Sequence, residues 1–143
     1  MRGELRLLPI SLLLVMPLTV VTAHADDVTG ADKLLCSSGQ LAACFDDGIC
    51  EHAPPSALNV PAFIEVDLVK KQLSTTPASG ENRVSPIRNL ERKDGRIVLQ
   101  GVEGGRAFSV LIDEPTGALT AAVARDGLGV VVFGNCTLAS AAR

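Results

Sequence analysis

The sequence predicts an all-β fold, in which an antiparallel meander of about seven or eight strands forms a strongly curved sheet or a small up-and-down barrel. Three observations predict it. Short apolar segments recur every 8–12 residues or so, Gly-rich turns separate them, and four cysteines suit a small disulfide-bonded domain. No amphipathic helix of credible length follows the N-terminal leader. A two-sheet sandwich is the alternative architecture.

Residues 1–25 have the pattern of a cleavable secretory signal peptide. Two arginines lie near the start, an apolar run covers residues 7–21, and small residues precede a cut expected after Ala25. The apolar run is about 15 residues long and contains two prolines, whereas a membrane-spanning helix needs about 20 apolar residues. We therefore expect residues 26–143 to form a single β-rich domain, secreted or periplasmic, with no membrane span after cleavage.

Removing the leader leaves 118 residues with 11 basic and 15 acidic side chains, a net charge of −4. This charge suits a soluble protein and argues against a nucleic-acid partner, because phosphate binding needs clustered Lys and Arg. The chain also has no Trp or Tyr on which bases could stack. Its length suffices for one domain with a modest core.

The four cysteines, Cys36, Cys44, Cys50 and Cys136, all follow the leader. In a small exported chain they predict two disulfides, and sequence alone leaves three pairings open. We favour Cys44–Cys50, which would clamp an Asp-Asp-Gly turn, and Cys36–Cys136, which would join the first strand to the last. A zinc site formed by Cys36, Cys44, Cys50 and His52 is the alternative. Its ligand spacings differ from the usual close pairs of C-x₂₋₄-C type.

The first half of the expected domain has fewer clear strands. Residues 26–32 are polar and predict a frayed segment, and 33–38 predict the first strand. Residues 51–56 contain two adjacent prolines and predict a linker. Apolar and polar residues alternate over 62–70, as in a half-buried strand, and 75–82 has the composition of a loop.

The second half predicts regularly spaced hairpins. A weaker strand over 84–91 contains Pro86, so it is expected to start late or lie at an edge. The following strands are expected at 96–102, 106–113, 118–124 and 129–137. The last of them is apolar on both faces over 130–133, which predicts a central or doubly covered strand.

Residues 99–137 carry the motifs of a resemblance. They read Leu-Gln-Gly-Val-Glu-Gly-Gly-Arg, then Ile-Asp-x-x-Thr-Gly, then Val-Val-Phe-Gly-Asn-Cys-Thr, and an early Leu-Leu-Cys and the Cys44/Cys50 pair precede them. Together they resemble a group of uncharacterised small secreted bacterial proteins that are rich in β-structure. The resemblance covers most of the chain after the leader. It implies an exported β-rich domain and no catalytic residues.

Few side chains are candidates for catalysis. His52 is the single histidine after the leader, it lies beside prolines, and the chain has no G-x-S-x-G nucleophile turn. Glu65 and Asp67 would share one strand face about 7 Å apart, a spacing found in glycosidase carboxylate pairs. The same spacing occurs on solvated strand faces that form cross-strand ion pairs.

Metal and cofactor signals are equally weak. Asp46–Asp47 and Asp113–Glu114 offer oxygen ligands for calcium, but both lie where turns favour Asp, and neither fits the calcium-loop pattern. The Gly-rich stretch 101–105 leads into a strand and not into a helix, so it predicts a hairpin and not a phosphate cradle. We expect no catalytic residue, cofactor or metal.

Three functions remain open. The leading hypothesis is a non-enzymatic binding or inhibitor-like module of the envelope or periplasm, with an envelope protein as partner. The first alternative is a carrier of a small apolar ligand inside the curved sheet, lined by inward side chains of two strands. The residues expected there are Ile64, Val66, Leu68, Phe108, Val110 and Ile112. The second alternative is a hydrolase that uses Glu65 and Asp67.

Overall fold

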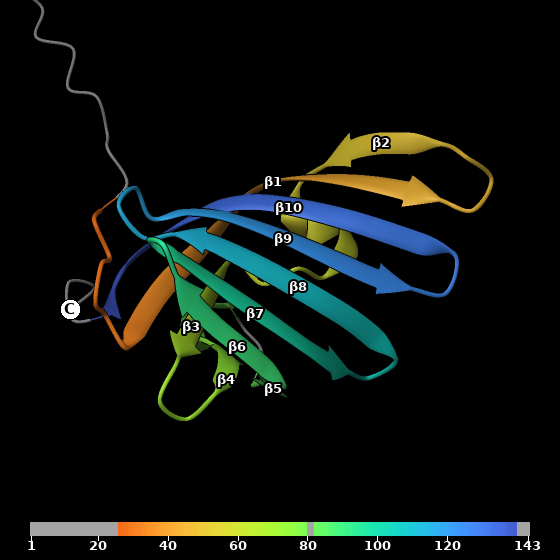
Figure 1. Ribbon diagram of the computed structural model, residues 1–143. Coiled ribbons are helices and arrows are strands. Elements are labelled where there is room, and N and C mark those ends of the chain that lie inside the picture. Colours follow the sequence, from red (N-terminus) through yellow and green to blue (C-terminus); the bar gives the residue numbers. More distant parts are fainter. Residues whose placement is uncertain (1–25, 80–81, 140–143) are drawn as a thin grey trace, which may run out of the picture.

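The computed structural model describes residues 26–79 and 82–139, so the expected leader lies outside the described residues. Within them, ten strands join one antiparallel sheet that curls into a half-barrel (Figure 1). This confirms the all-β class and the strongly curved sheet. The strands are β1 (Lys33–Phe45), β2 (Cys50–Ala53), β3 (Phe63–Asp67), β4 (Gln72–Thr75), β5 (Val84–Pro86), β6 (Asn89–Lys93), β7 (Arg96–Glu103), β8 (Arg106–Asp113), β9 (Ala118–Arg125) and β10 (Leu128–Leu138). Two short 3₁₀ helices, η1 (Pro55–Leu58) and η2 (Pro77–Ser79), complete the elements.

The sheet runs in the order β5-β4-β3-β1-β10-β9-β8-β7-β6, and β2 pairs with the far half of β1. β5 and β6 form one bent segment that connects the two edges of this order. The Ile87 amide donates to the Lys71 carbonyl next to β4, and the Arg88 amide donates to the Gln100 carbonyl of β7, both at 2.8 Å. If β5 and β6 count as one strand and β2 as an appendage, the ten strands reduce to eight.

Both favoured disulfides are present. Cys36 and Cys136 lie opposite each other in the β1–β10 ladder and are joined by a bond of 2.06 Å. Cys44 and Cys50 lie opposite each other in the β1–β2 ladder and are joined by a bond of 2.03 Å. The first bond is buried on the inner face of the sheet, whereas Cys44 and Cys50 are exposed.

One end of the half-barrel is filled by a hydrophobic cluster and closed by the N-terminal segment. The cluster contains fully buried Leu34, Ile97, Leu99 and Ile112. Val28 is also 0 % exposed, and its amide donates to the carbonyl of the residue that follows β8, at 2.8 Å. The prediction of a frayed segment over 26–32 is therefore wrong. A single valine among mostly polar residues gives no periodic pattern from which its burial could be predicted. In the structure its side chain packs into the cluster at this end of the half-barrel.

A second, smaller cluster lies on the inner face towards the other end of β1 and β10. Its buried members are Leu41, Ala43, Leu128, Val130 and Val132. The chain reaches this region again through β2 and η1, and Leu58 of η1 packs against the cluster. The predicted linker at 51–56 is thus partly wrong, because its first residues belong to β2.

The outer face of β10 differs from its inner face. The strand is central, between β1 and β9, as predicted. Its outward residues Val131 and Phe133 are nevertheless 36 % and 48 % exposed, so no described residue covers that face fully. Among residues 26–79 and 82–139, no helix has both the length and the apolar character to cross a membrane.

Candidate functional site

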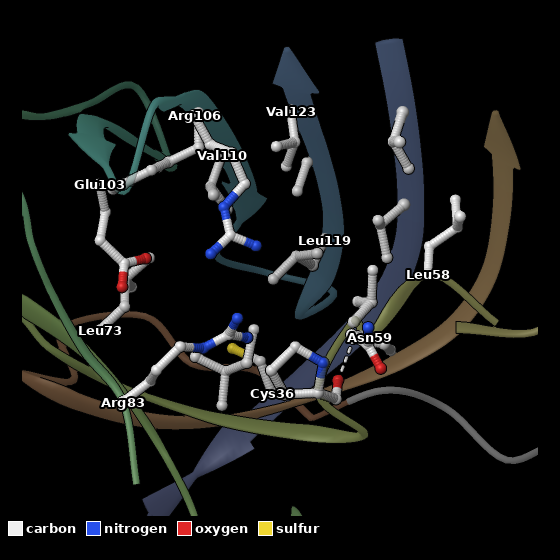
Figure 2. A pocket seen from close by; sticks show the side chains of 18 of the residues that line it. Cys36, Leu58, Asn59, Leu73, Arg83, Glu103, Arg106, Val110, Leu119 and Val123 are labelled. Carbon is white, nitrogen blue, oxygen red and sulfur yellow. Dashed lines mark hydrogen bonds between the residues drawn. The ribbon is translucent and has the colours of Figure 1, made fainter. Parts of the chain in front are cut away.

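A pocket of about 170 Å³ lies on the inner face of the sheet, between the two hydrophobic clusters (Figure 2). Side chains of β8, β9 and β10 form its main wall. Phe108 and Val110 come from β8, Ala121 and Val123 from β9, and Val130 from β10. Because successive side chains of a strand point to opposite faces, these residues at every second position share the concave side.

The pocket extends towards the sheet at one row of side chains that are neighbours across three strands. Val110, Ala121 and Val132 are direct neighbours across β8, β9 and β10. Ala121 has the smallest side chain of the three and lies in the middle of the row. The space that a larger side chain would fill is therefore part of the pocket.

The opposite wall comes from the segment that follows the two prolines. Asn59, the residue that follows η1, has a φ of 53°, which reverses the chain. The amide of Val60 then donates to the carbonyl of Pro55 at 3.0 Å, which holds the turn closed. Leu58 and Val60 are half-buried and line the pocket. A stretch with the composition of a linker thus forms one side of the site.

Charged side chains gather on the rim. Arg83, Glu103, Arg106 and Arg125 all line the pocket. Figure 2 shows the guanidinium groups of Arg83 and Arg106 extending into the pocket from opposite walls, with the Glu103 carboxylate at one side. Glu103 accepts a hydrogen bond from the Ser85 hydroxyl at 2.7 Å. Three cations and one anion give the rim a positive charge.

The residues expected to line a cavity divide between this site and the core. Ile64, Val66, Phe108 and Val110 do line the pocket. Leu68 and Ile112 belong to the cluster at the closed end instead. The rim arginines were not expected, because they are far apart in the sequence and only the sheet brings them together.

The carboxylates proposed for a hydrolase lie outside the pocket. Asp67 is 8 % exposed, accepts the Lys70 amide at 2.8 Å and lies 3.5 Å from the Lys33 ammonium group. The Lys70 hydrogen bond and the nearby Lys33 hold the pKa of Asp67 below its usual value, despite burial. Glu65 is exposed on the strand face opposite to that of Ile64. Asp67 thus already has structural partners.

The acidic residues of the turns also have partners within the chain. Buried Glu114 accepts hydrogen bonds from Arg92 Nε at 2.8 Å and from the Gly30 amide at 3.3 Å. The Arg92 hydrogen bond is the main cause that lowers the pKa of Glu114. Asp113 accepts the Thr116 hydroxyl at 2.6 Å. Within the described ranges, no group of three His, Cys, Asp or Glu side chains is placed to hold a metal ion.

The other candidates have structural explanations. Asp47 caps its own turn by accepting the Ile49 amide at 2.9 Å. His52 is exposed on β2 and lies opposite Ala42 of β1. Gly101 is buried under an aromatic ring, since a Cβ atom there would lie 2.3 Å from Phe108 Cζ. The glycines at 104–105 have positive φ angles, as the expected hairpin turn requires.

Comparisons of this chain with protein-family models, with curated proteins and with solved structures find no match.

Proposed function

We propose that this protein is a non-enzymatic binding module that holds a small apolar molecule in the pocket between the two hydrophobic clusters. The observation that carries the proposal is a concave space on the inner face of the sheet whose lining is mostly apolar, with a few charged side chains beside the apolar wall (Figure 2). Ligand sites are typically concave and apolar, with a few polar groups that fix orientation. We therefore propose that the protein carries or senses a small apolar molecule and does not catalyse a reaction.

The pocket volume limits the ligand. At about 170 Å³ the pocket is close to the engineered cavity of about 150 Å³ that binds benzene. It is smaller than the range of about 300–1,000 Å³ found for drug-sized ligands. We therefore expect one aromatic ring or a short alkyl chain, and not a long acyl chain.

The walls support binding because they are largely fixed before a ligand arrives. β8, β9 and β10 are hydrogen-bonded to neighbours on both sides, and Cys36 in the pocket wall is tied to Cys136. A preformed site avoids the entropy cost of ordering side chains and loops on binding. The binding free energy then has to offset only the translational and rotational entropy that the ligand itself loses.

We also propose that the protein works in an oxidising compartment. Two disulfides in a small domain favour export, and the leader pattern ends at Ala25. We propose a secreted or periplasmic protein cut after that residue, with an envelope protein as a further partner. The intact mass of the protein purified from its own host tests the cut. A mass that retains the first 25 residues would contradict it.

The pocket can be tested by filling it. We expect benzene and 1-hexanol to cause saturable shifts in amide resonances near Val110 and Val123 in a nuclear magnetic resonance titration. Ala121→Leu should remove these shifts while the protein stays folded, because the leucine occupies the space of the ligand. Ala122→Leu is the matched control, since Ala122 is exposed on the opposite face of the same strand. If the unaltered protein shows no saturable shift with either probe, the proposal is wrong.

A further inference from the structure

The pocket rim differs in charge from the protein as a whole. The chain carries a net charge of −3, yet the ionisable side chains that line the pocket are three arginines and one glutamate. Basic residues scattered over a surface would not indicate a site for an anion. Here the positive charge is concentrated beside the apolar space.

Arg106 is one of the two arginines labelled in Figure 2 whose guanidinium groups extend into this space. It is the first residue of β8, it is half-buried, and its guanidinium group extends into the pocket (Figure 2). It forms no ion pair with the described residues. Glu103, its direct neighbour across the hairpin, is hydrogen-bonded to Ser85 instead.

A guanidinium group in this position fits a carboxylate. It presents N–H donors in a planar fork that matches the two oxygens of a carboxylate, and such charge-assisted pairs are stronger than neutral hydrogen bonds. The apolar wall lowers the local dielectric constant and strengthens the attraction. Because Arg106 is only half-buried, the carboxylate would keep part of its contact with water, which limits the cost of desolvation.

We propose that the ligand is an anionic amphiphile, with a carboxylate bound by Arg106 at the rim and a short apolar body that reaches towards Ala121. This inference rests on the proposed function and adds the chemical class of the ligand. Arg83 and Arg125 contribute two further positive charges to the same pocket lining. Short alkanoic acids and aromatic carboxylic acids have the required form.

Matched pairs of ligands test the inference without altering the protein. We expect hexanoate to bind about 10- to 100-fold more tightly than 1-hexanol in a resonance titration at low salt, the range given by hydrogen bonds to charged groups. Acetate, which has the charge without the tail, should bind far more weakly than hexanoate. Added salt should reduce the preference for hexanoate, because the charged pair is partly exposed.

Variants assign the effect to one side chain. Arg106→Gln should weaken hexanoate binding by about 10- to 100-fold and leave 1-hexanol unchanged. Arg106→Lys should fall between the two, because it keeps the charge and loses the fork. Arg96→Gln is the control, since Arg96 is exposed at the start of β7 and does not line the pocket.

The outcomes separate the two proposals. If 1-hexanol and hexanoate bind equally well, the pocket stands and the anionic ligand is wrong. The anionic ligand is also wrong if Arg106→Gln and Arg96→Gln leave the preference for hexanoate equally intact. If neither ligand shifts the pocket resonances of the unaltered protein, the proposed function itself is wrong.

Discussion

Removing the two disulfides one at a time should have clearly unequal effects on stability. The bonds close loops with sequence separations of 100 and 6 residues. In the chain-entropy model a loop of about 100 residues contributes about 4.7 kcal/mol at 25 °C, and the same relation gives about 2.2 kcal/mol for the short loop. The pair Cys36→Ala with Cys136→Ala should therefore cost more than Cys44→Ala with Cys50→Ala.

Burial of the Cys36–Cys136 bond increases the expected difference in stability loss between the two double variants. Cys36 and Cys136 are each 2 % exposed, so shortening both side chains also removes core contacts, at a cost of about 1–2 kcal/mol. Cys44 and Cys50 are exposed, so their replacement should cost little beyond the loop term. The expected losses are about 6 and 2 kcal/mol, or roughly 24 and 8 °C in Tm for a domain of this size.

Urea unfolding with circular dichroism detection measures both losses, with the m-value fitted separately for each variant because removing a cross-link expands the unfolded chain. The protein with both bonds removed serves as the control for additivity, because the two bonds lie in different parts of the sheet. Equal losses in the two double variants, or a larger loss for the exposed bond, would refute the reasoning.

Three further predictions concern stability. Hydrogen bonds from Arg92 lower the pKa of Glu114 in the folded state, so the stability that Glu114 contributes is present above the usual pKa of a glutamate and is lost as the pH falls through the lower, folded-state pKa. Glu114→Gln should therefore flatten the loss of stability as the pH falls below the usual pKa of a glutamate, in an acid titration of Tm. Gly101→Ala should lower stability by about 1–3 kcal/mol in urea unfolding, because the added Cβ would lie 2.6 Å from a backbone oxygen, whereas Gly129→Ala, with nothing within 4 Å, should change it by less than about 0.5 kcal/mol. Val28→Ala should cost about 1–3 kcal/mol and speed hydrogen exchange in the N-terminal segment, and a value near zero would mean that this segment does not close the half-barrel.

The hairpins were predictable because two independent local signals coincide in them. The strand over 106–113 was expected at its observed bounds, since its inward residues alternate and Gly-containing turns flank it. By contrast, β1 extends seven residues beyond the expected end at Ser38. A glycine follows there and indicates a break, but the ladder with β10 shifts register between Ser38 and Gln40 and continues. A bulge absorbs the irregular residue, and only the partner strand reveals it.

The pocket was partly predictable and its rim was not. Period-two alternation identifies which side chains point inward, so Phe108 and Val110 were correctly expected to line an interior. It does not indicate where inward side chains leave a space, because that depends on which residues meet across strands. Arg83, Arg106 and Arg125 come from three separate parts of the chain. Their proximity to one pocket is a property of strand order.

The buried disulfide connects the stability of this fold with its proposed function. Cys36 is a member of the closed-end cluster and also lines the pocket, so the bond to Cys136 holds one boundary of the pocket in place. Ligand affinity and global stability should therefore be coupled at this bond. The exposed bond at the far end of β1 lies outside the pocket, so its loss should lower stability while binding to the remaining folded protein is retained. A site formed by flexible loops would not distinguish the two bonds in this way, because neither would hold its walls.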